Sequence, residues 1–242
     1  MSEGPPLLVL CALAPEQWAL RGGDWARALG GPPVLARTGM GPTRAGRTVR
    51  TLLAAAPQGY GAVVMTGFCA AAASGTTPGE VIVADRVHCA SGRSLTTDSP
   101  APLAQALTGL GMSVRPGALH TADHVVRGHE RRVLSRSGIV AVDMESAAVF
   151  DAVSDQLPAG LPIAAVRVVV DTPERELLRP GTVPAGLRAF RTLRALVPAL
   201  LGWHRAVVGA RAGAQHLPPI PEPANQSLLT YSSLPTLPQE AS

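Results

Sequence analysis

Continuous apolar runs alternate with helical patterns along most of the chain. Short unbroken runs are typical of strands buried on both faces, and apolar residues at every third or fourth position are typical of amphipathic helices. We predict strands at residues 7–13, 34–37, 62–65, 80–87, 114–119, 139–142 and 162–170. We predict helices at residues 14–29, 43–56, 101–110, 127–135, 144–153 and 183–208, with a kink at Pro198 in the last one. This alternation predicts a single-domain α/β fold with a mixed central sheet flanked by helices.

The pattern stops near residue 212. Residues 217–223 read LPPIPEP, and Ser, Gln and Thr follow them. This segment lacks the apolar density that a packed core requires. We therefore expect a folded domain at residues 1–211 and a disordered, Pro-rich tail at residues 212–242.

Composition narrows the kinds of partner. Aromatic residues make up only 3% of the 242 residues, so the core must consist mainly of Ala, Val and Leu. All 21 basic residues are arginines, and the net charge is +4. The arginines are scattered, with short groups at Arg44/Arg47/Arg50 and Arg127/Arg131/Arg132, which we interpret as solvated helix faces. We expect no nucleic-acid partner.

The sequence gives no indication of a secreted or membrane-spanning protein. The residues before the first apolar run lack the basic region of a signal peptide, and no apolar run is long enough to span a bilayer. The Leu-rich last helix is expected to pack on the domain rather than on a membrane surface, which is the less favoured alternative. The three cysteines, Cys11, Cys69 and Cys89, show no metal-ligand spacing. We expect a cytoplasmic protein that needs no metal and no cofactor.

Three carboxylates fall where predicted strands end. Glu16 follows the first strand, Glu145 follows the strand at 139–142, and Asp171 follows the strand at 162–170. An acidic residue after a strand is often only a helix cap, the role we assign to Asp143. If the strands are parallel neighbours, however, all three side chains face one crevice at the carboxyl edge of the sheet, where ligands bind in open α/β sheets.

Three carboxylates in one crevice suit the cleavage of an N-glycosidic bond. A purine leaves readily only if an acid protonates or hydrogen-bonds a ring nitrogen, and the sugar gains positive charge as the bond breaks. A base must also activate the attacking water. Asp171 can act as the acid, Glu145 can bind the ribose hydroxyls, and Glu16 can act as the base.

Four segments carry a resemblance to a known family. They are LLVLCALAPE at 7–16, VVMTGFCAAAASGTTPGEVIVADRV at 63–87, VDMESAA at 142–148 and VRVVVDT at 166–172. In this order they resemble the motifs of the purine nucleoside phosphorylase and nucleosidase superfamily, and VDMESAA is the most specific. The resemblance implies the phosphorylase/nucleosidase fold, a purine nucleoside substrate, water or phosphate as co-substrate, and a homodimer or larger homo-oligomer.

The resemblance also implies roles for single residues. Asp171 and Glu16 would be catalytic. The stretch 121–126 resembles a family segment in which an aromatic side chain stacks on the base, and Val125 has that position. The residues implied to bind the substrate are Phe68, Cys69, Ala70, Val125, Met144 and Glu145. No base stands beside Cys69 in the sequence, so we interpret this cysteine as a buried thiol rather than a nucleophile.

Departures from the family pattern point to a specialised enzyme. Met65 and Phe68 occupy positions where phosphorylases hold phosphate, which favours hydrolysis, although Arg21 or Arg44, or Arg44 from a neighbouring subunit, could bind phosphate instead. Val170 replaces the usual Ser before Asp171, and Ala70 begins an Ala-Ala pair in place of Gly-Gly. We expect an adenosine-type nucleoside with an unusual 5′ substituent, as in methylthioadenosine nucleosidases, futalosine hydrolases or the phosphorylase-like enzymes of hopanoid biosynthesis. The alternative from another class is a catalytically inactive nucleoside-binding protein.

Overall fold

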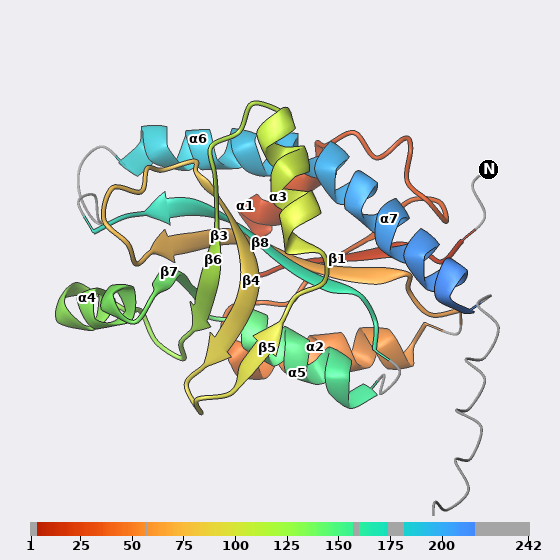
Figure 1. The fold of residues 1–242 in the computed structure, drawn as a ribbon, viewed down its shortest axis with the longest axis horizontal. Helices are drawn as coiled ribbons and strands as arrows, with labels where there is room; N and C mark the ends of the chain where they lie inside the picture. The colour runs from red at the N-terminus through yellow and green to blue at the C-terminus, as the bar shows by residue number, and fades with distance from the viewer. Residues whose placement is uncertain (1–3, 57, 157–159, 174–181, 216–242) are drawn as a thin grey trace, which may run out of the picture.

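The computed structural model describes residues 4–56, 58–156, 160–173 and 182–215. The strands are β1 (Leu7–Cys11), β2 (Val34–Arg37), β3 (Ala62–Ala71), β4 (Val81–Cys89), β5 (Ser94–Thr96), β6 (Val114–Thr121), β7 (Ile139–Asp143) and β8 (Ile163–Asp171). The helices are α1 (Ala14–Arg21), α2 (Pro42–Ala54), α3 (Pro100–Gly109), α4 (Gly128–Arg136), α5 (Ser146–Gln156), α6 (Thr182–Ala195) and α7 (Val197–Gln215). The predicted α/β fold is confirmed, with a single mixed sheet between helices (Figure 1).

The sheet is mixed because strands of both directions meet on β3 and β8. β3 pairs in parallel with β1 and β8, and in antiparallel with β7. β8 in turn pairs in antiparallel with β4, and β4 pairs in parallel with β6. Because β6 also pairs with β7, the ladder returns to β3 and part of the sheet closes on itself. The expectation that the three carboxylate-bearing strands are parallel neighbours is therefore correct for β1 and β8 around β3, and wrong for β7.

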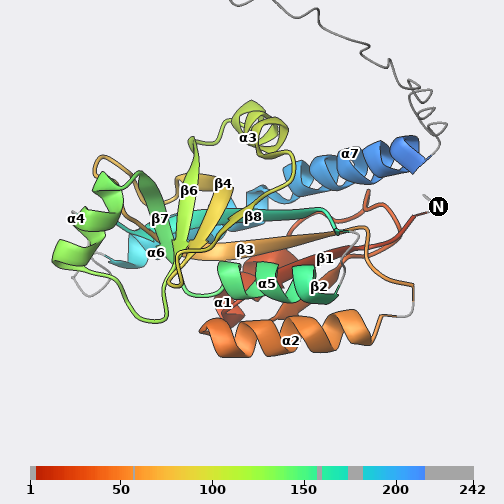
Figure 2. The same cartoon turned by 60° about the horizontal axis from the view of Figure 1, so that its bottom comes forward.

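Helices cover both faces of the sheet. In Figures 1 and 2, α2 and α5 lie on one face, while α1, α3, α6 and α7 lie on the other. Each layer has its own apolar core, and β1 contributes alternate residues to both: Leu7 and Val9 to one, Leu8 and Leu10 to the other. This alternation follows from the two-residue period of a strand, and it explains why β1 is apolar at every position.

The helix boundaries differ from the predicted ones at two places. α1 ends at Arg21, well before the predicted residue 29, and the chain turns at Gly22. The predicted single helix at 183–208 is two helices, because Pro198 lies in the first turn of α7, where its missing N–H costs no hydrogen bond. α7 continues to Gln215, past the predicted domain boundary, and the remainder of the predicted tail lies outside the described residues.

The last helix packs on the domain. Leu200, Trp203, His204 and Val207 of α7 are buried, and the Trp203 indole N–H donates to the Asp98 carbonyl at 2.9 Å. The expectation of a packing helix is confirmed. Within the described residues, no helix combines the length and the apolar character that crossing a bilayer would require.

Candidate active site

One pocket brings the predicted catalytic and substrate-binding residues together. It lies where β1, β3 and β8 end and where β7 leads into α5. Its lining includes both predicted catalytic residues and all the residues predicted to bind the substrate: Glu16, Phe68, Cys69, Ala70, Val125, Met144, Glu145 and Asp171. Since these residues are up to 155 positions apart, the sheet topology rather than local sequence assembles them.

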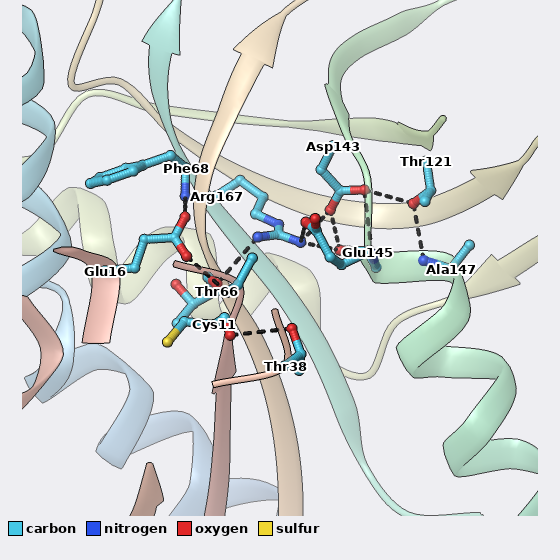
Figure 3. Close-up of polar contacts among 12 residues, drawn as sticks. Cys11, Glu16, Thr38, Thr66, Phe68, Thr121, Asp143, Glu145, Ala147 and Arg167 are labelled. Carbon is cyan, nitrogen blue, oxygen red and sulfur yellow. Dashed lines mark hydrogen bonds and ion pairs between the residues drawn. The ribbon is translucent and has the colours of Figure 1, made fainter. Parts of the chain in front are cut away.

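Glu16 is held rigidly by backbone N–H groups. Its Oε2 accepts hydrogen bonds from the N–H of Ala12 and Leu13 at 2.8 and 2.7 Å, and its Oε1 accepts one from Phe68 N–H at 2.6 Å (Figure 3). Burial raises the pKa of Glu16 above its ordinary value, while Arg167 and these hydrogen bonds oppose the rise. An ionised carboxylate offers about four acceptor positions, so three donors leave Glu16 about one for a water molecule.

Gly67 makes the position of Glu16 possible. A Cβ at residue 67 would lie 2.5 Å from Glu16 Oε1, and Gly67 has φ +133°, which other residues rarely adopt. Glycine is therefore required after Thr66 in β3, because a side chain at residue 67 would displace the Glu16 carboxylate from its hydrogen bonds.

Glu145 lies at the other side of the same charged network. Its Oε1 accepts a hydrogen bond from Gly41 N–H at 3.0 Å, and its Oε2 lies 3.6 Å from Arg167 Nη2. Burial raises the pKa of Glu145, Arg167 opposes this rise, and Asp143 adds to it. One backbone N–H and a buried arginine together therefore favour the ionised form of Glu145 against the cost of burial.

Arg167 is the functional residue to which we assigned no role from the sequence. It lies in the middle of β8, is fully buried, and forms an ion pair with Asp143. Its Nη1 donates to the Thr66 carbonyl at 3.2 Å and its Nη2 donates to Ser146 Oγ at 3.0 Å (Figure 3). Burial opposes its charge, but Asp143, Glu145 and Glu16 together raise the pKa of Arg167 above its ordinary value. The sequence feature that could have revealed Arg167 is an arginine in the middle of the otherwise apolar strand IAAVRVVVD, which ends at Asp171.

Asp143 combines the predicted capping role with an ionic one. Its Oδ1 accepts from Ser146 N–H at 3.3 Å, as expected of a residue that caps α5, and from Thr121 Oγ1 at 2.7 Å. Thr121 Oγ1 in turn accepts from Ala147 N–H at 3.0 Å. Asp143 thus ties the start of α5, the end of β6 and Arg167 together, which fixes the backbone that carries Glu145.

Asp171 has a different partner, Arg131 of α4. Arg131 Nη2 donates to Asp171 Oδ2 at 2.7 Å, and both side chains are buried. Our interpretation of Arg131 as part of a solvated helix face is wrong: it is 2% exposed, although its neighbour Arg132 is exposed. The reason is the reach of the side chain, which extends from α4 to a carboxylate at the end of β8.

The remaining lining is largely apolar. Phe68, Val125 and Val170 contribute side chains to it, and Val170 presents no hydrogen-bond donor next to Asp171. Burial raises the pKa of the Cys69 thiol, so this thiol stays neutral and inert. Burial likewise raises the pKa of the Cys11 thiol, to about 12. The geometry thus gives Cys69 the character of a buried thiol.

The two arginines predicted as phosphate ligands do not line the pocket. Arg21 and Arg44 are both exposed, on α1 and α2 respectively. Among the lining residues in the described part of the chain, His124 is the only one with a basic side chain. It contacts Asp123 at 2.7 Å and Glu130 at 3.0 Å, and these contacts raise its pKa. Four carboxylates belong to the lining, Glu16, Asp143, Glu145 and Asp171, and the buried arginines that pair with three of them lie behind it.

The chain combines a mixed α/β sheet with a carboxylate-lined pocket where β1, β3 and β8 end, and the comparisons identify its family. The profile described as "Phosphorylase superfamily" matches residues 25–185, so the chain belongs to that superfamily. A search of curated protein sequences finds no match.

Solved structures share the fold at low sequence identity. One is the 5′-methylthioadenosine/S-adenosylhomocysteine nucleosidase from Neisseria meningitidis in complex with methylthio-immucillin-A, with 19% identity, a TM-score of 0.66 and coverage of 82% of this chain and 98% of that one. A second is a mutant of the futalosine hydrolase of Helicobacter pylori, with 16% identity, a TM-score of 0.66 and coverage of 84% and 100%. A third is the S-adenosylhomocysteine nucleosidase from Streptococcus pyogenes, with 22% identity, a TM-score of 0.63 and coverage of 80% and 96%.

Proposed function

We propose that the protein hydrolyses the N-glycosidic bond of an adenosine-type nucleoside with an apolar 5′ substituent and releases the free base. The observation that carries this proposal is the convergence of four carboxylates on one pocket whose described lining holds no arginine. Such a pocket stabilises the positive charge that develops on the sugar, and its described lining offers a phosphate anion no arginine. Family membership and the nucleosidases among the similar structures support the same reaction class.

The reaction divides among three residues. Glu16 takes a proton from water as the water oxygen bonds to C1′, and the C1′–N bond breaks with its electron pair going to the base. Asp171 donates a proton to a ring nitrogen of the leaving purine. Glu145 accepts hydrogen bonds from the ribose hydroxyls, and these bonds strengthen as the sugar becomes cationic. Solvent then carries a proton from Glu16 to Asp171, so the net reaction consumes one water.

The pocket mouth suggests the kind of 5′ substituent. Leu13, Met40 and Val125 line the pocket and are nevertheless 37%, 60% and 59% exposed, so their apolar surfaces face the entrance. An apolar group bound there would bury these surfaces. An alkylthio or other hydrocarbon-like 5′ group therefore suits this entrance better than a charged one.

The decisive experiment measures base release with and without phosphate. Purified protein is incubated with 5′-methylthioadenosine, S-adenosylhomocysteine and adenosines that carry longer 5′-alkyl groups, and free adenine is followed by chromatography. Release that is independent of phosphate supports hydrolysis. Release only with phosphate would replace the proposal with a phosphorylase, for example of the adenosyl-hopane type, and no release from any substrate would favour an inactive binding protein.

Variants test the assigned roles. Asp171→Asn is expected to lower kcat by about 10²–10⁴-fold with little change in KM, because the acid acts only in the transition state. Glu145→Gln is expected to impair both KM and kcat. Asp123→Asn is the matched control, since this carboxylate is 76% exposed, lies near the pocket and has no assigned catalytic role. Full activity of Asp171→Asn would remove Asp171 from the acid role.

We also propose that the protein forms a homodimer through the face that carries the pocket entrance. Leu13 and Met40 line the pocket and expose 37% and 60% of their surface, and Trp18 of α1, the helix that carries Glu16, exposes 62%; large exposed apolar side chains are typical of an interface. Light scattering coupled to size exclusion tests this, with Trp18→Glu as the interface variant. A wild-type monomer at micromolar concentration would contradict the proposal.

A further inference from the structure

Arg131 is a buried arginine that no motif explains. It lies on α4, which is far from β8 in sequence, and it is 2% exposed. Within the described part of the chain its Nη2 makes two hydrogen bonds, to Asp171 Oδ2 at 2.7 Å and to the Val126 carbonyl at 3.3 Å. Its Nε and Nη1 are buried and have no partner among the residues that the structure describes.

This arrangement is a poor way to stabilise a fold. The attraction within a buried ion pair roughly offsets the free energy of removing both charges from water only when the remaining donors are also hydrogen-bonded. Apolar residues of similar volume in the same place often make a protein more stable. Arg131 leaves two donors unsatisfied. Its placement is therefore better explained by what it does to Asp171 than by the stability it adds.

The geometry divides the two oxygens of Asp171 between different tasks. Oδ2 accepts from Arg131, whereas Oδ1 is buried and has no partner among the described residues. Asp171 lines the pocket, but Arg131 does not, so the arginine approaches the carboxyl group from behind. Because an oxygen that accepts from a guanidinium is a poor place for a proton, the proton of a neutral Asp171 belongs on Oδ1.

Arg131 also connects two walls of the pocket. The nitrogen that binds Asp171 binds the carbonyl of Val126, and both Val125 and Val126 line the pocket. Val170, the residue before Asp171, supplies no donor of its own. One guanidinium thus sets the position of the carboxyl group relative to residues 125–126 of the pocket wall.

We propose that Arg131 is the positioning residue of Asp171: it holds Oδ2, so that Oδ1 is the oxygen that carries the proton for the leaving purine. This assignment rests on the proposed function and deepens it. Arg131 transfers no proton itself and does not touch the substrate. It acts by fixing which oxygen of Asp171 carries the proton and how far the carboxyl group lies from Val126.

The test combines three variants with a double-mutant cycle for base release. Arg131→Met, which keeps much of the length, is expected to lower kcat by about 10–100-fold and to leave KM within about threefold. Arg131→Lys restores a donor and a charge, so it is expected to recover most of the lost kcat. Arg132→Met is the matched control, because Arg132 is the exposed neighbour on the same helix, and its kinetics should equal those of the wild type.

The double variant separates positioning from a merely structural role. If Arg131 acts through Asp171, adding Arg131→Met to Asp171→Asn should cost little further activity, since the acid is already lost. Additive losses, or a full kcat for Arg131→Met in an active enzyme, would overturn the assignment of Arg131 and leave the proposed function intact. A wild type that releases no base would overturn the proposed function and this assignment with it. If Arg131→Met does not fold, the cycle is made with Arg131→Gln, which keeps a polar side chain but carries no charge, and a kcat equal to wild type for this variant is the contradicting result.

Discussion

Arg167 and Arg131 are both buried behind the pocket, and both pair with carboxylates that line it, yet their surroundings differ. Arg167 meets Asp143 and Glu145, and it also donates to the Thr66 carbonyl and to Ser146 Oγ. Arg131 meets one carboxylate and one carbonyl and leaves two nitrogens without partners among the described residues. The charged network on the side of Glu145 and Glu16 is therefore fixed by many contacts, whereas the side of Asp171 rests on few.

The difference teaches how such a site can change its substrate. Arg167 pairs with Glu145, and its charge also lowers the pKa of Glu16, so a change at the arginine affects both proposed groups. The residues around Asp171 are apolar or singly bonded, and a substitution such as Val170 for a polar residue leaves the Arg167 network intact. We therefore expect variation to disturb less on the Asp171 side, where Val170, one of the departures from the family pattern, lies.

The largest expected effect comes from breaking the Arg167 network. Arg167→Met leaves Asp143 and Glu145 buried without their cation, and it should destabilise the fold by about 3–5 kcal/mol. Arg131→Met strands one carboxylate that faces an open pocket, and roughly 2 kcal/mol is expected. Urea denaturation followed by circular dichroism measures both.

The surface pair Arg50–Asp155 supplies the reference for that experiment. Its side chains are 48% and 61% exposed, so Arg50→Met should cost less than about 1 kcal/mol. Equal losses for Arg167→Met and Arg131→Met would erase the proposed contrast between the two sides of the site.

A smaller effect, on activity rather than folding, is expected from Gly67. Gly67→Ala places a methyl group against Glu16 Oε1, so the carboxylate must leave its hydrogen bond with Phe68 N–H. We expect kcat to fall by about 10²-fold, because a misplaced base loses its alignment with water. Steady-state kinetics measure this, with Gly75→Ala as the control for a left-handed glycine that has no atoms near its absent Cβ. Unchanged kinetics in Gly67→Ala would argue against Glu16 as the base.

The pH dependence should separate activity from stability. Burial raises the pKa of Glu16 and of Glu145 above the ordinary 4.5, so the folded protein favours their protonated forms. The stability that these groups contribute is therefore present below about pH 4.5 and is lost as pH rises through the raised values. Activity requires the carboxylates and should rise over the same interval, by up to about tenfold per pH unit.

Melting temperatures and kcat/KM measured on one buffer series test this opposition. In Glu16→Gln, the melting temperature should depend less on pH than in the wild type, because one titrating group is gone. The variant should also lack the activity that Glu16 supports as base. A wild-type kcat/KM that stays constant down to about pH 4.5 would contradict the raised pKa of the base.

The sequence predicts the fold and the three acids for a physical reason. β1, β3 and β8 are apolar at nearly every position, so burial fixes them as central strands, and parallel pairing then brings Glu16 and Asp171 to one edge. The antiparallel pairing of β7 with β3 was not predictable from the sequence, because it depends on how the sheet closes on itself. Glu145 reaches the pocket all the same, since the turn into α5 carries it there.

The two arginines show what pattern reading misses. Arg167 could have been singled out, since a charge inside a buried strand requires a partner. Arg131 could not: α4 reads GHERRVLSR, with adjacent arginines, and only the reach of one side chain to Asp171 distinguishes it from Arg132. Burial of a long side chain depends on partners brought close by the fold, and helical spacing does not report them.

The smallest expected effect concerns the apolar entrance and tests the adaptable side of the site directly. Met40→Gln and Val125→Ser replace exposed apolar surface at the mouth of the pocket with polar groups. Each should raise KM for an apolar 5′-alkyl substrate by about 3–10-fold, because apolar surface buried by the substrate contributes roughly 25 cal/mol per Å². Because neither residue touches the Arg167 network, kcat and the free energy of unfolding should stay near wild type. A KM that rises equally for adenosine without a 5′ extension would mean that these side chains contact the nucleoside itself. A large loss of kcat would mean that the entrance and the charged network are coupled, which the separation of their contacts argues against.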